Sequence, residues 1–284
     1  MRRWWAAAAL LLLAGCGSGG ARFARIASTT TSSSTTSTTV EPPTTAASTT
    51  TTTIARPAAT TTTRPTVAAA ASAGSCPANL ASSIANTYSA RQLATVESSS
   101  YDTDVATVTL WQRAGTCWQL AAGPWSGFIG YNGFSDRKHE GDGTTPTGIY
   151  GFGPVVYGND ADPGVHETYH LLVCGDWWDE DPSSAQYNTF QHVQQCGTTP
   201  NWSTGSEALW TEKAPYPSFA VIDYNTDPVV NGAGSAIFLH ASTGGSTAGC
   251  VSVPLSDLDW FLRWMEPSQD PLIVMGPASE IARF

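Results

Sequence analysis

The chain has 284 residues, with 23 acidic and 13 basic side chains, which gives a formal net charge of −10 at neutral pH. Six of the basic residues but only one acidic residue precede Cys76, so the part from Cys76 onward has seven basic and 22 acidic residues and a net charge of −15. Nucleic-acid backbones are held mainly by Lys and Arg, so this balance argues against a nucleic-acid partner.

Residues 1–16 have the pattern of a bacterial export signal. Two arginines precede the apolar run Trp4–Leu13, which is too short to span a bilayer. The run ends in Leu13-Ala14-Gly15-Cys16, which resembles the lipobox of bacterial lipoproteins. The resemblance implies cleavage before Cys16, diacylation of its thiol and an anchor on the outer face of the cell membrane. The alternative is a secreted protein whose Cys16 lies in the discarded peptide.

Residues 17–75 are predicted to be a disordered linker. They consist mostly of Thr, Ser, Ala and Pro, and this composition buries too little apolar area to offset the entropy of the chain. Such a linker lets a lipid-anchored domain explore the cell wall beside its membrane. A glycosylated, mucin-like stalk is the alternative.

Residues 76–284 are expected to form one domain, because they are long enough for a substantial core and contain neither a second linker nor an internal repeat. Short segments rich in Val, Ile, Thr and aromatic residues recur between turn signals, which predicts a mainly β fold. The expected strands are 106–112, 117–121, 148–152, 169–174, 219–224, 236–240 and 272–275.

Two helices are expected in this domain. The first spans about Ala78 to Tyr88, and the second begins at Ser256, where Ser256 and Asp259 have the spacing of a capping box. Residues 176–213 form a long, irregular, aromatic-rich stretch, which is either an insertion near an active site or a disulfide-tied excursion on the surface. Its aromatic residues either pack a small core of their own or line a groove for a sugar or peptide.

Five cysteines follow Cys16, and an odd number in an exported protein leaves one thiol unpaired. Cys250 is the candidate for the free thiol, because its glycine-rich loop gives it a chemical reason to stay reduced. The other four fall in two local groups, and we predict the disulfides Cys76–Cys117 and Cys174–Cys196. Four cysteines permit three pairings, and the sequence does not choose between them.

His166-Glu167-Thr168-Tyr169-His170 matches the H-E-x-x-H pattern of zinc peptidases, in which two histidines one helical turn apart bind the metal. The surrounding residues favour a strand, and on a strand His166 and His170 would be about 13 Å apart. A zinc peptidase is therefore an alternative that the context disfavours.

His240 and Cys250 lie ten positions apart across a loop that contains Gly244, Gly245 and Gly249. Cysteine attacks as the thiolate, and a neighbouring imidazole can take its proton, so the pair is a candidate nucleophile and base. We expect a strand to deliver His240 to the loop, and a tight turn to bring the chain back to Cys250. The alternative for His240 is a hydrogen-bonded histidine of the core.

This stretch resembles the catalytic loop of the L,D-transpeptidases of peptidoglycan, the YkuD-like family. The family pattern is a His, a loop, and then Ser/Thr-His-Gly-Cys followed by a hydrophobic residue and Arg or Asn. The matching positions are His240, Thr247, Gly249, Cys250 and Val251. We expect the Thr247 hydroxyl to bond the loop backbone and to shape the approach to Cys250.

Two positions depart from the family pattern. Ala248 stands where the family has its second His, and Ser252 stands where it has Arg or Asn. Ser252 cannot offer a substrate carboxylate the contact that Arg or Asn would give. A second similarity lies upstream, where the segment 143–150 is similar to the T-P-x-G-x-[FY] stretch of these domains, and the resemblance covers about Val105 to Gly276.

The resemblance implies a β-sandwich-like domain of mixed sheet with few helices, and a reaction without metal or cofactor. Cys250, with His240 as its base, would attack a tetrapeptide stem of peptidoglycan, and backbone N–H groups around Gly249 and Cys250 would stabilise the oxyanion. The acyl group would pass to an amine on a neighbouring stem. The alternatives are a carboxypeptidase that passes it to water, and a non-catalytic lipoprotein that binds the wall.

Overall fold

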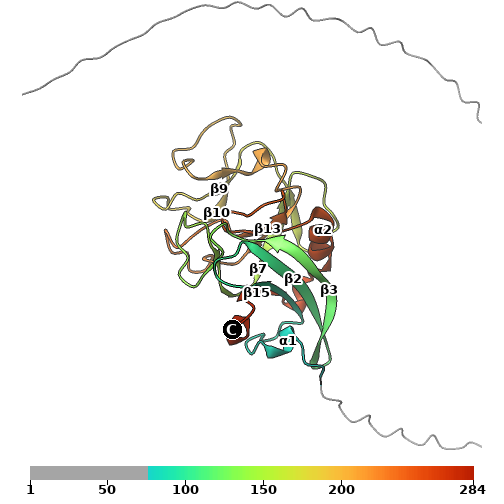
Figure 1. The fold of residues 1–284 in the computed structure, drawn as a ribbon. Helices are drawn as coiled ribbons and strands as arrows, with labels where there is room; N and C mark the ends of the chain where they lie inside the picture. The colour runs from blue at the N-terminus through green and yellow to red at the C-terminus, as the bar shows by residue number, and fades with distance from the viewer. Residues whose placement is uncertain (1–75) are drawn as a thin grey trace, which may run out of the picture. The chain divides into compact units, whose positions relative to one another are not determined.

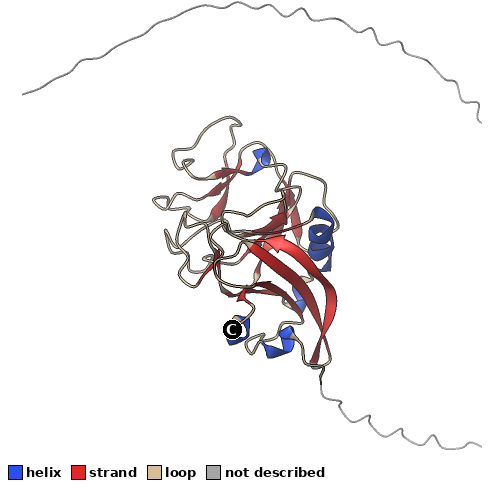
Figure 2. Cartoon of the chain, in the orientation of Figure 1, coloured by secondary structure: helices blue, strands red, loops and turns tan. Residues whose placement is uncertain are grey.

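The computed structural model describes residues 76–284, which form a mostly β structure (Figure 1, Figure 2). This confirms the expected fold class. The expected export signal, the lipidation site Cys16 and the linker lie outside the described residues. Within residues 76–284, none of the helices has the length and apolar character that crossing a membrane requires.

A curled mixed sheet of ten strands dominates the structure. Its order is β6 (Gly148–Tyr150), β15 (Leu272–Pro277), β1 (Gln92–Ser98), β2 (Val105–Ala114), β3 (Cys117–Phe128), β14 (Val251–Val253), β13 (Phe238–Ala241), β12 (Phe219–Ile222), β7 (Phe152–Gly158) and β8 (Thr168–Leu171). Three neighbouring pairs are parallel, namely β1 with β15, β13 with β14 and β7 with β8. The long strands β2 and β3 form a curved hairpin that is prominent in Figure 1.

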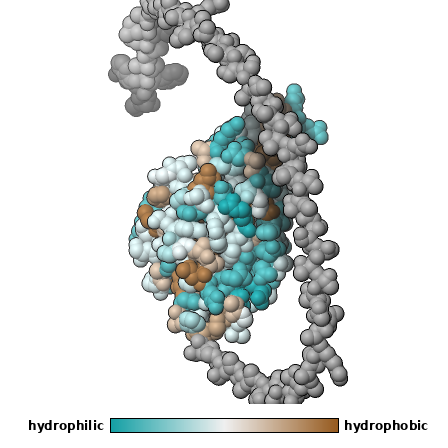
Figure 3. All heavy atoms as spheres, turned by 90° about the vertical axis from the view of Figure 1, so that its right-hand side faces the viewer, coloured by the Kyte–Doolittle hydropathy of each residue, from teal (hydrophilic) through white to brown (hydrophobic). Residues whose placement is uncertain are grey.

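The helix α2 (Leu255–Trp264) covers one face of the sheet at β13 and β14 (Figure 1). Alternate strand residues such as Leu239 and Val251 share a fully buried core with Phe261 of this helix. Burying one such side chain stabilises the fold by about 1.5–3 kcal/mol. Seen from the side that carries α2 and β3, hydrophobic residues appear on the surface as separate patches (Figure 3). The large apolar side chains that remain exposed on these elements include Leu120 of β3 and Leu255 and Trp260 of α2.

A second, small sheet covers the opposite face of β13. It has the order β10 (Thr189–His192), β9 (Asp176–Asp179) and β11 (Glu207–Ala208), and belongs to the aromatic-rich stretch 176–213. Trp178 of β9 packs edge-on against Phe238 of β13, with 5.0 Å between the ring centroids. The aromatic side chains thus pack a core of their own against the main sheet, as one of the two interpretations predicted.

Both disulfides have the predicted pairing. Cys76 and Cys117 tie the first described residue to the turn of the β2–β3 hairpin, while Cys174 and Cys196 close a loop around β9 and β10. The carboxylate of Asp176, which is fully buried, holds the same region together by bonding His170 Nε2 at 2.9 Å and His192 Nδ1 at 2.6 Å.

The two helices differ from their predicted bounds. α1 spans only Leu80–Ser83, because Ile84 adopts an extended backbone that buries its side chain and ends the helix. α2 begins at Leu255, directly after Pro254, and no side chain caps it, so the predicted start and capping box at Ser256 are wrong. The remaining elements are short, namely β4 (Phe134–Ser135), β5 (Thr145–Pro146) and the 3₁₀ helices Leu209–Thr211, Pro267–Gln269 and Ile281–Arg283.

Candidate active site

Neighbouring parallel strands bring His240 and Cys250 to the same face of the main sheet. His240 lies in β13 opposite Ser252 of β14, and Cys250 directly precedes β14. Because successive side chains of a strand alternate between faces, His240 and Cys250 both point away from the core under α2. The loop between them does not fold back as the predicted tight turn. It crosses over to start a strand parallel to β13.

The thiol of Cys250 is buried and is the one free thiol among residues 76–284. It donates a hydrogen bond to the backbone oxygen of Ala236 at 3.1 Å, and the N–H of Phe238 donates to its sulfur at 3.4 Å. Burial raises the pKa of this thiol well above its ordinary value, and the nearby carboxylate of Glu207 raises it further. The uncharged thiol is therefore the resting form.

The imidazole of His240 is also buried, and its Nδ1 lies 2.9 Å from the backbone oxygen of Ala241. A carbonyl oxygen only accepts hydrogen bonds, so Nδ1 carries the proton and Nε2 keeps a free lone pair. Burial lowers the pKa of His240 to about 4, so the ring is neutral at pH 7. Within residues 76–284, no hydrogen bond joins this ring to the Cys250 thiol.

The loop before Cys250 is held by Thr247 as predicted. The Thr247 hydroxyl donates to the backbone oxygen of Cys250 at 2.7 Å and accepts from the N–H of Gly249 at 3.1 Å. A side chain at Gly249 would collide with the backbone oxygen of Thr144, which explains the glycine. Because its N–H is already bonded, Gly249 does not offer the free oxyanion donor that was expected of it.

A cavity of about 210 Å³ opens at Cys250. Ala248 and Gly249 line it beside the thiol. The predicted substrate-loop residue Ser252 does not line it, because its side chain is buried, and its hydroxyl has no hydrogen-bond partner within residues 76–284. Four charged side chains also line the cavity, namely Lys138, Glu140, Glu180 and Glu207. None of them was identified from the sequence, where they lie far from Cys250. Two of them, Glu180 and Glu207, belong to the stretch 176–213. An insertion near the active site was one of the two interpretations of this stretch.

The H-E-x-x-H residues lie elsewhere. His170 lies in β8, on a strand as predicted, and bonds Asp176, while His166 lies 3.5 Å from Glu266. Among residues 76–284, no group of three His, Cys, Asp or Glu side chains has the arrangement of a metal site.

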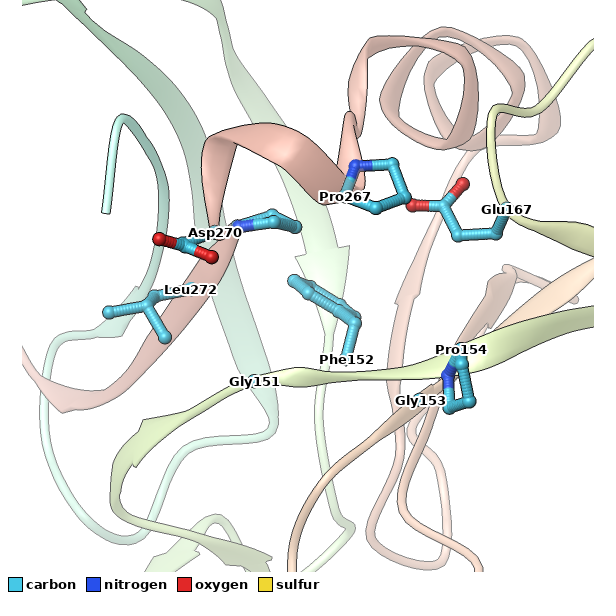
Figure 4. Close-up of a pocket in the computed structure, with 9 residues that line it drawn as sticks. Gly151, Phe152, Gly153, Pro154, Glu167, Pro267, Asp270 and Leu272 are labelled. Atoms are coloured by element: carbon cyan, nitrogen blue, oxygen red, sulfur yellow. The ribbon is translucent and has the colours of Figure 1, made fainter. Parts of the chain in front are cut away.

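A second cavity, of about 330 Å³, lies between the start of β7 and the connection from α2 to β15 (Figure 4). Phe152 and Leu272 line it together with several prolines, and the side chain of Glu167 lies at its edge near Pro267. Neither His240 nor Cys250 reaches it, so it is separate from the cavity at the thiol.

Comparison with known proteins identifies the family of this chain. The sequence profile of the YkuD family, described as the L,D-transpeptidase catalytic domain, matches residues 104–274. The structure of the helical cell shape determining protein Pgp2 from Campylobacter jejuni aligns with a TM-score of 0.33 and 15% identity, over 67% of this chain and 53% of that one, so this chain spans about half of it. A search of the curated proteins gave no significant match. The family match spans more than half of the chain, and the protein therefore belongs to the YkuD family of L,D-transpeptidase catalytic domains.

Proposed function

We propose that this protein is a peptidoglycan L,D-transpeptidase in which Cys250 forms an acyl-enzyme with a tetrapeptide stem. The observation that carries the proposal is the free thiol at the cavity, with the neutral His240 on the same face of the sheet. Peptidoglycan is the substrate that membership of the family implies. The lipid anchor at Cys16 belongs to the same proposal, because it would hold the enzyme outside the membrane within reach of the wall.

The first step forms a bond between the Cys250 sulfur and the carbonyl carbon of the third stem residue. The thiol leaves Ala236, Nε2 of His240 takes its proton, and the same proton then passes to the departing amine of the terminal D-Ala as the C–N bond breaks. A neutral histidine suits this role, because it can accept the proton as the attack proceeds. In the second step an uncharged amine of a neighbouring stem attacks the thioester carbonyl and the C–S bond breaks. His240 takes a proton from the attacking amine and passes it to the departing sulfur, which restores the Cys250 thiol.

The backbone supplies one donor for the oxyanion. The N–H of Cys250 has no hydrogen-bond partner within residues 76–284, whereas that of Gly249 is bonded to Thr247. Removing one such donor typically lowers the rate by a factor of about 100–1,000. The orientation of the peptide unit between Gly249 and Cys250 is therefore important. Thr247 and Thr145, which bond the backbone oxygens of Cys250 and Gly249, are the residues that hold it.

The test uses the purified full chain, a tetrapeptide stem as donor and a second stem as acceptor. Intact mass should show an acyl adduct on the protein, and the product should be a crosslinked dimer. Cys250→Ala should lose at least a factor of about 1,000 in dimer formation, while Ser256→Ala, on the solvent side of α2, serves as the control. Crosslinked product from Cys250→Ala would contradict the proposal. Product released to water even with acceptor present would indicate a carboxypeptidase instead.

A further inference from the structure

A third cavity, of about 260 Å³, lies beside the small sheet, on the same face of the main sheet as His240. It shares no lining residue with the cavity at Cys250. Trp178 of β9 lines it, whereas Glu180, two residues further along the chain, lines the cavity at Cys250. Two residues of a strand span roughly 7 Å, so the two cavities are close neighbours. We call the third one the Trp178 cavity.

An interruption in the pairing of β7 with β12 forms part of the Trp178 cavity. Between two paired positions, residues 153–155 of β7 lie opposite Val221 alone. Pro154 has no N–H to donate to the sheet, and Gly153 has no side chain to fill the space. All four of these residues line the cavity. Bulges of this kind are over-represented next to active sites.

The aromatic walls of the Trp178 cavity are held in place by contacts within the protein. The indole N–H of Trp178 donates to the side-chain oxygen of Asn188 at 3.0 Å, and this oxygen also accepts from the N–H of Ala236 at 3.0 Å. The ring of Tyr157 is stacked against that of Phe190, with 5.0 Å between the centroids. These contacts fix the rings, so the cavity is formed before any ligand binds.

Asp223 is the one charged side chain among the described residues that line this cavity. Its carboxyl group has no hydrogen-bond partner within residues 76–284, and burial raises its pKa. A Cβ at Gly151 would come within 3.2 Å of its Oδ2, and one at Gly153 within 3.8 Å of its Oδ1. The two glycines therefore leave space beside both oxygens. Hydrogen-bond donors of a ligand would remove the cost of a partly buried carboxylate without partners.

A ligand that fits this cavity has an apolar group for the walls and adjacent hydrogen-bond donors for the carboxylate. Asp223 would repel an anion, and none of the described residues that line the cavity is basic. A lone ammonium group would pair with Asp223 but would leave the apolar walls unfilled. An N-acetylated amino sugar has both features. The methyl of its acetamido group is apolar, while the acetamido N–H and the hydroxyl on the next ring carbon can donate to the two carboxylate oxygens.

We propose that the Trp178 cavity binds a neutral N-acetylated amino sugar of a glycan chain, with Asp223 accepting from its acetamido N–H and the adjacent hydroxyl. This inference goes beyond the proposed function, because binding a sugar requires no reaction at Cys250. The two are compatible. Since β9 contributes to one cavity and the residue after it to the other, one wall polymer could present a stem to the thiol and a sugar to Asp223.

The test titrates the unmodified full-length chain, by calorimetry, with three β-linked tetramers that consist of N-acetylglucosamine, glucosamine or glucose. We expect the N-acetylglucosamine tetramer to bind at least about tenfold more tightly than the other two. Asp223→Asn should weaken its binding by at least about tenfold. Glu167→Gln is the matched control and should leave it unchanged, because Glu167 also has a raised pKa but lies at the adjoining cavity of Figure 4.

The absence of binding by the N-acetylglucosamine tetramer, or equal binding of the glucose tetramer, would overturn the inference, and neither result depends on the folding of a variant. Tighter binding of the glucosamine tetramer would overturn it in favour of an ammonium site. So would unchanged affinity in an Asp223→Asn protein with an unaltered circular dichroism spectrum. The acyl adduct with a tetrapeptide is measured separately. Binding of the sugar as expected, by a chain that forms no adduct, would support the sugar site and contradict the proposed function.

Discussion

The two faces of the β13–β14 pair bury different kinds of side chain, although the residues alternate along the same strands. On the face under α2, Leu239 and Val251 are fully buried in a cluster of aliphatic and aromatic side chains. On the other face, His240 packs edge-on against the ring of Tyr216, and Cys250 lines a cavity together with the carboxyl groups of Glu180 and Glu207. One face forms an apolar core, whereas the other holds a thiol and an imidazole in their uncharged forms. Substitutions at the adjacent residues Leu239 and His240 of β13 therefore compare the roles of the two faces.

The largest expected effect is on activity at His240. His240→Gln keeps the size of the side chain and removes the base, so the rate of acyl-adduct formation should fall by a factor of about 100–10,000. Intact-mass kinetics with the tetrapeptide donor measure it. Acylation at the rate of the unmodified protein would show that another group accepts the thiol proton. Any change in the free energy of unfolding that accompanies His240→Gln is compared with the change caused by a substitution at the neighbouring Leu239.

Leu239→Ala should affect stability rather than chemistry. It leaves a cavity in the core under α2, and we expect a loss of about 2–5 kcal/mol in the free energy of unfolding, measured by urea titration. The folded fraction of Leu239→Ala should form the acyl adduct at a rate within a few fold of that of the unmodified protein. A change in rate as large as that of His240→Gln would mean that the two faces are not separable.

The pH dependence of stability should distinguish the same two faces. The pKa of His240 is about 4 in the folded protein and near 6.5 in the unfolded chain, so the unfolded chain binds more protons between these values. The contribution of His240 to the free energy of unfolding is therefore fully present above pH 6.5. It is lost as the pH falls towards 4, and the total loss is about 3 kcal/mol. Urea midpoints across this range should fall more steeply for the unmodified protein than for His240→Gln. Parallel curves would contradict the assignment of a buried neutral ring.

The smallest expected effect is at Glu180. Its oxygen Oε1 is buried without a hydrogen-bond partner within residues 76–284, so Glu180→Gln should leave the free energy of unfolding at pH 8 unchanged or raise it by about 1 kcal/mol. A thermal unfolding scan at low salt measures the difference. A marked loss of stability would show that the carboxyl group of Glu180 stabilises the packing of residues 176–213.

Much of the fold followed from local patterns. Segments rich in Val, Ile, Thr and aromatic residues predicted β2, β15 and the start of β3, but β1 and β7 were missed. The number of cysteines left one thiol over, and the glycine-rich loop assigned it to Cys250, which is the free thiol among residues 76–284. The first helix was predicted too long. Ile84 has an extended backbone instead of a helical one, and its side chain packs in a hydrophobic cluster with residues distant in the sequence. The crossover between β13 and β14 was missed, because the glycine-rich loop allows both a tight turn and a parallel connection.

The sequence by itself determined the class of fold and the family and predicted a candidate nucleophile, because periodicity, cysteine number and a short motif are properties of neighbouring residues. Only the tertiary structure decided the environment of the Cys250 thiol. The neutral state of His240, the hydrogen bonds of the Cys250 thiol and the carboxyl groups of Glu180 and Glu207 all depend on burial and on contacts between segments that are far apart in the chain. Desolvation and charge–charge interactions act through space, so no local pattern encodes them.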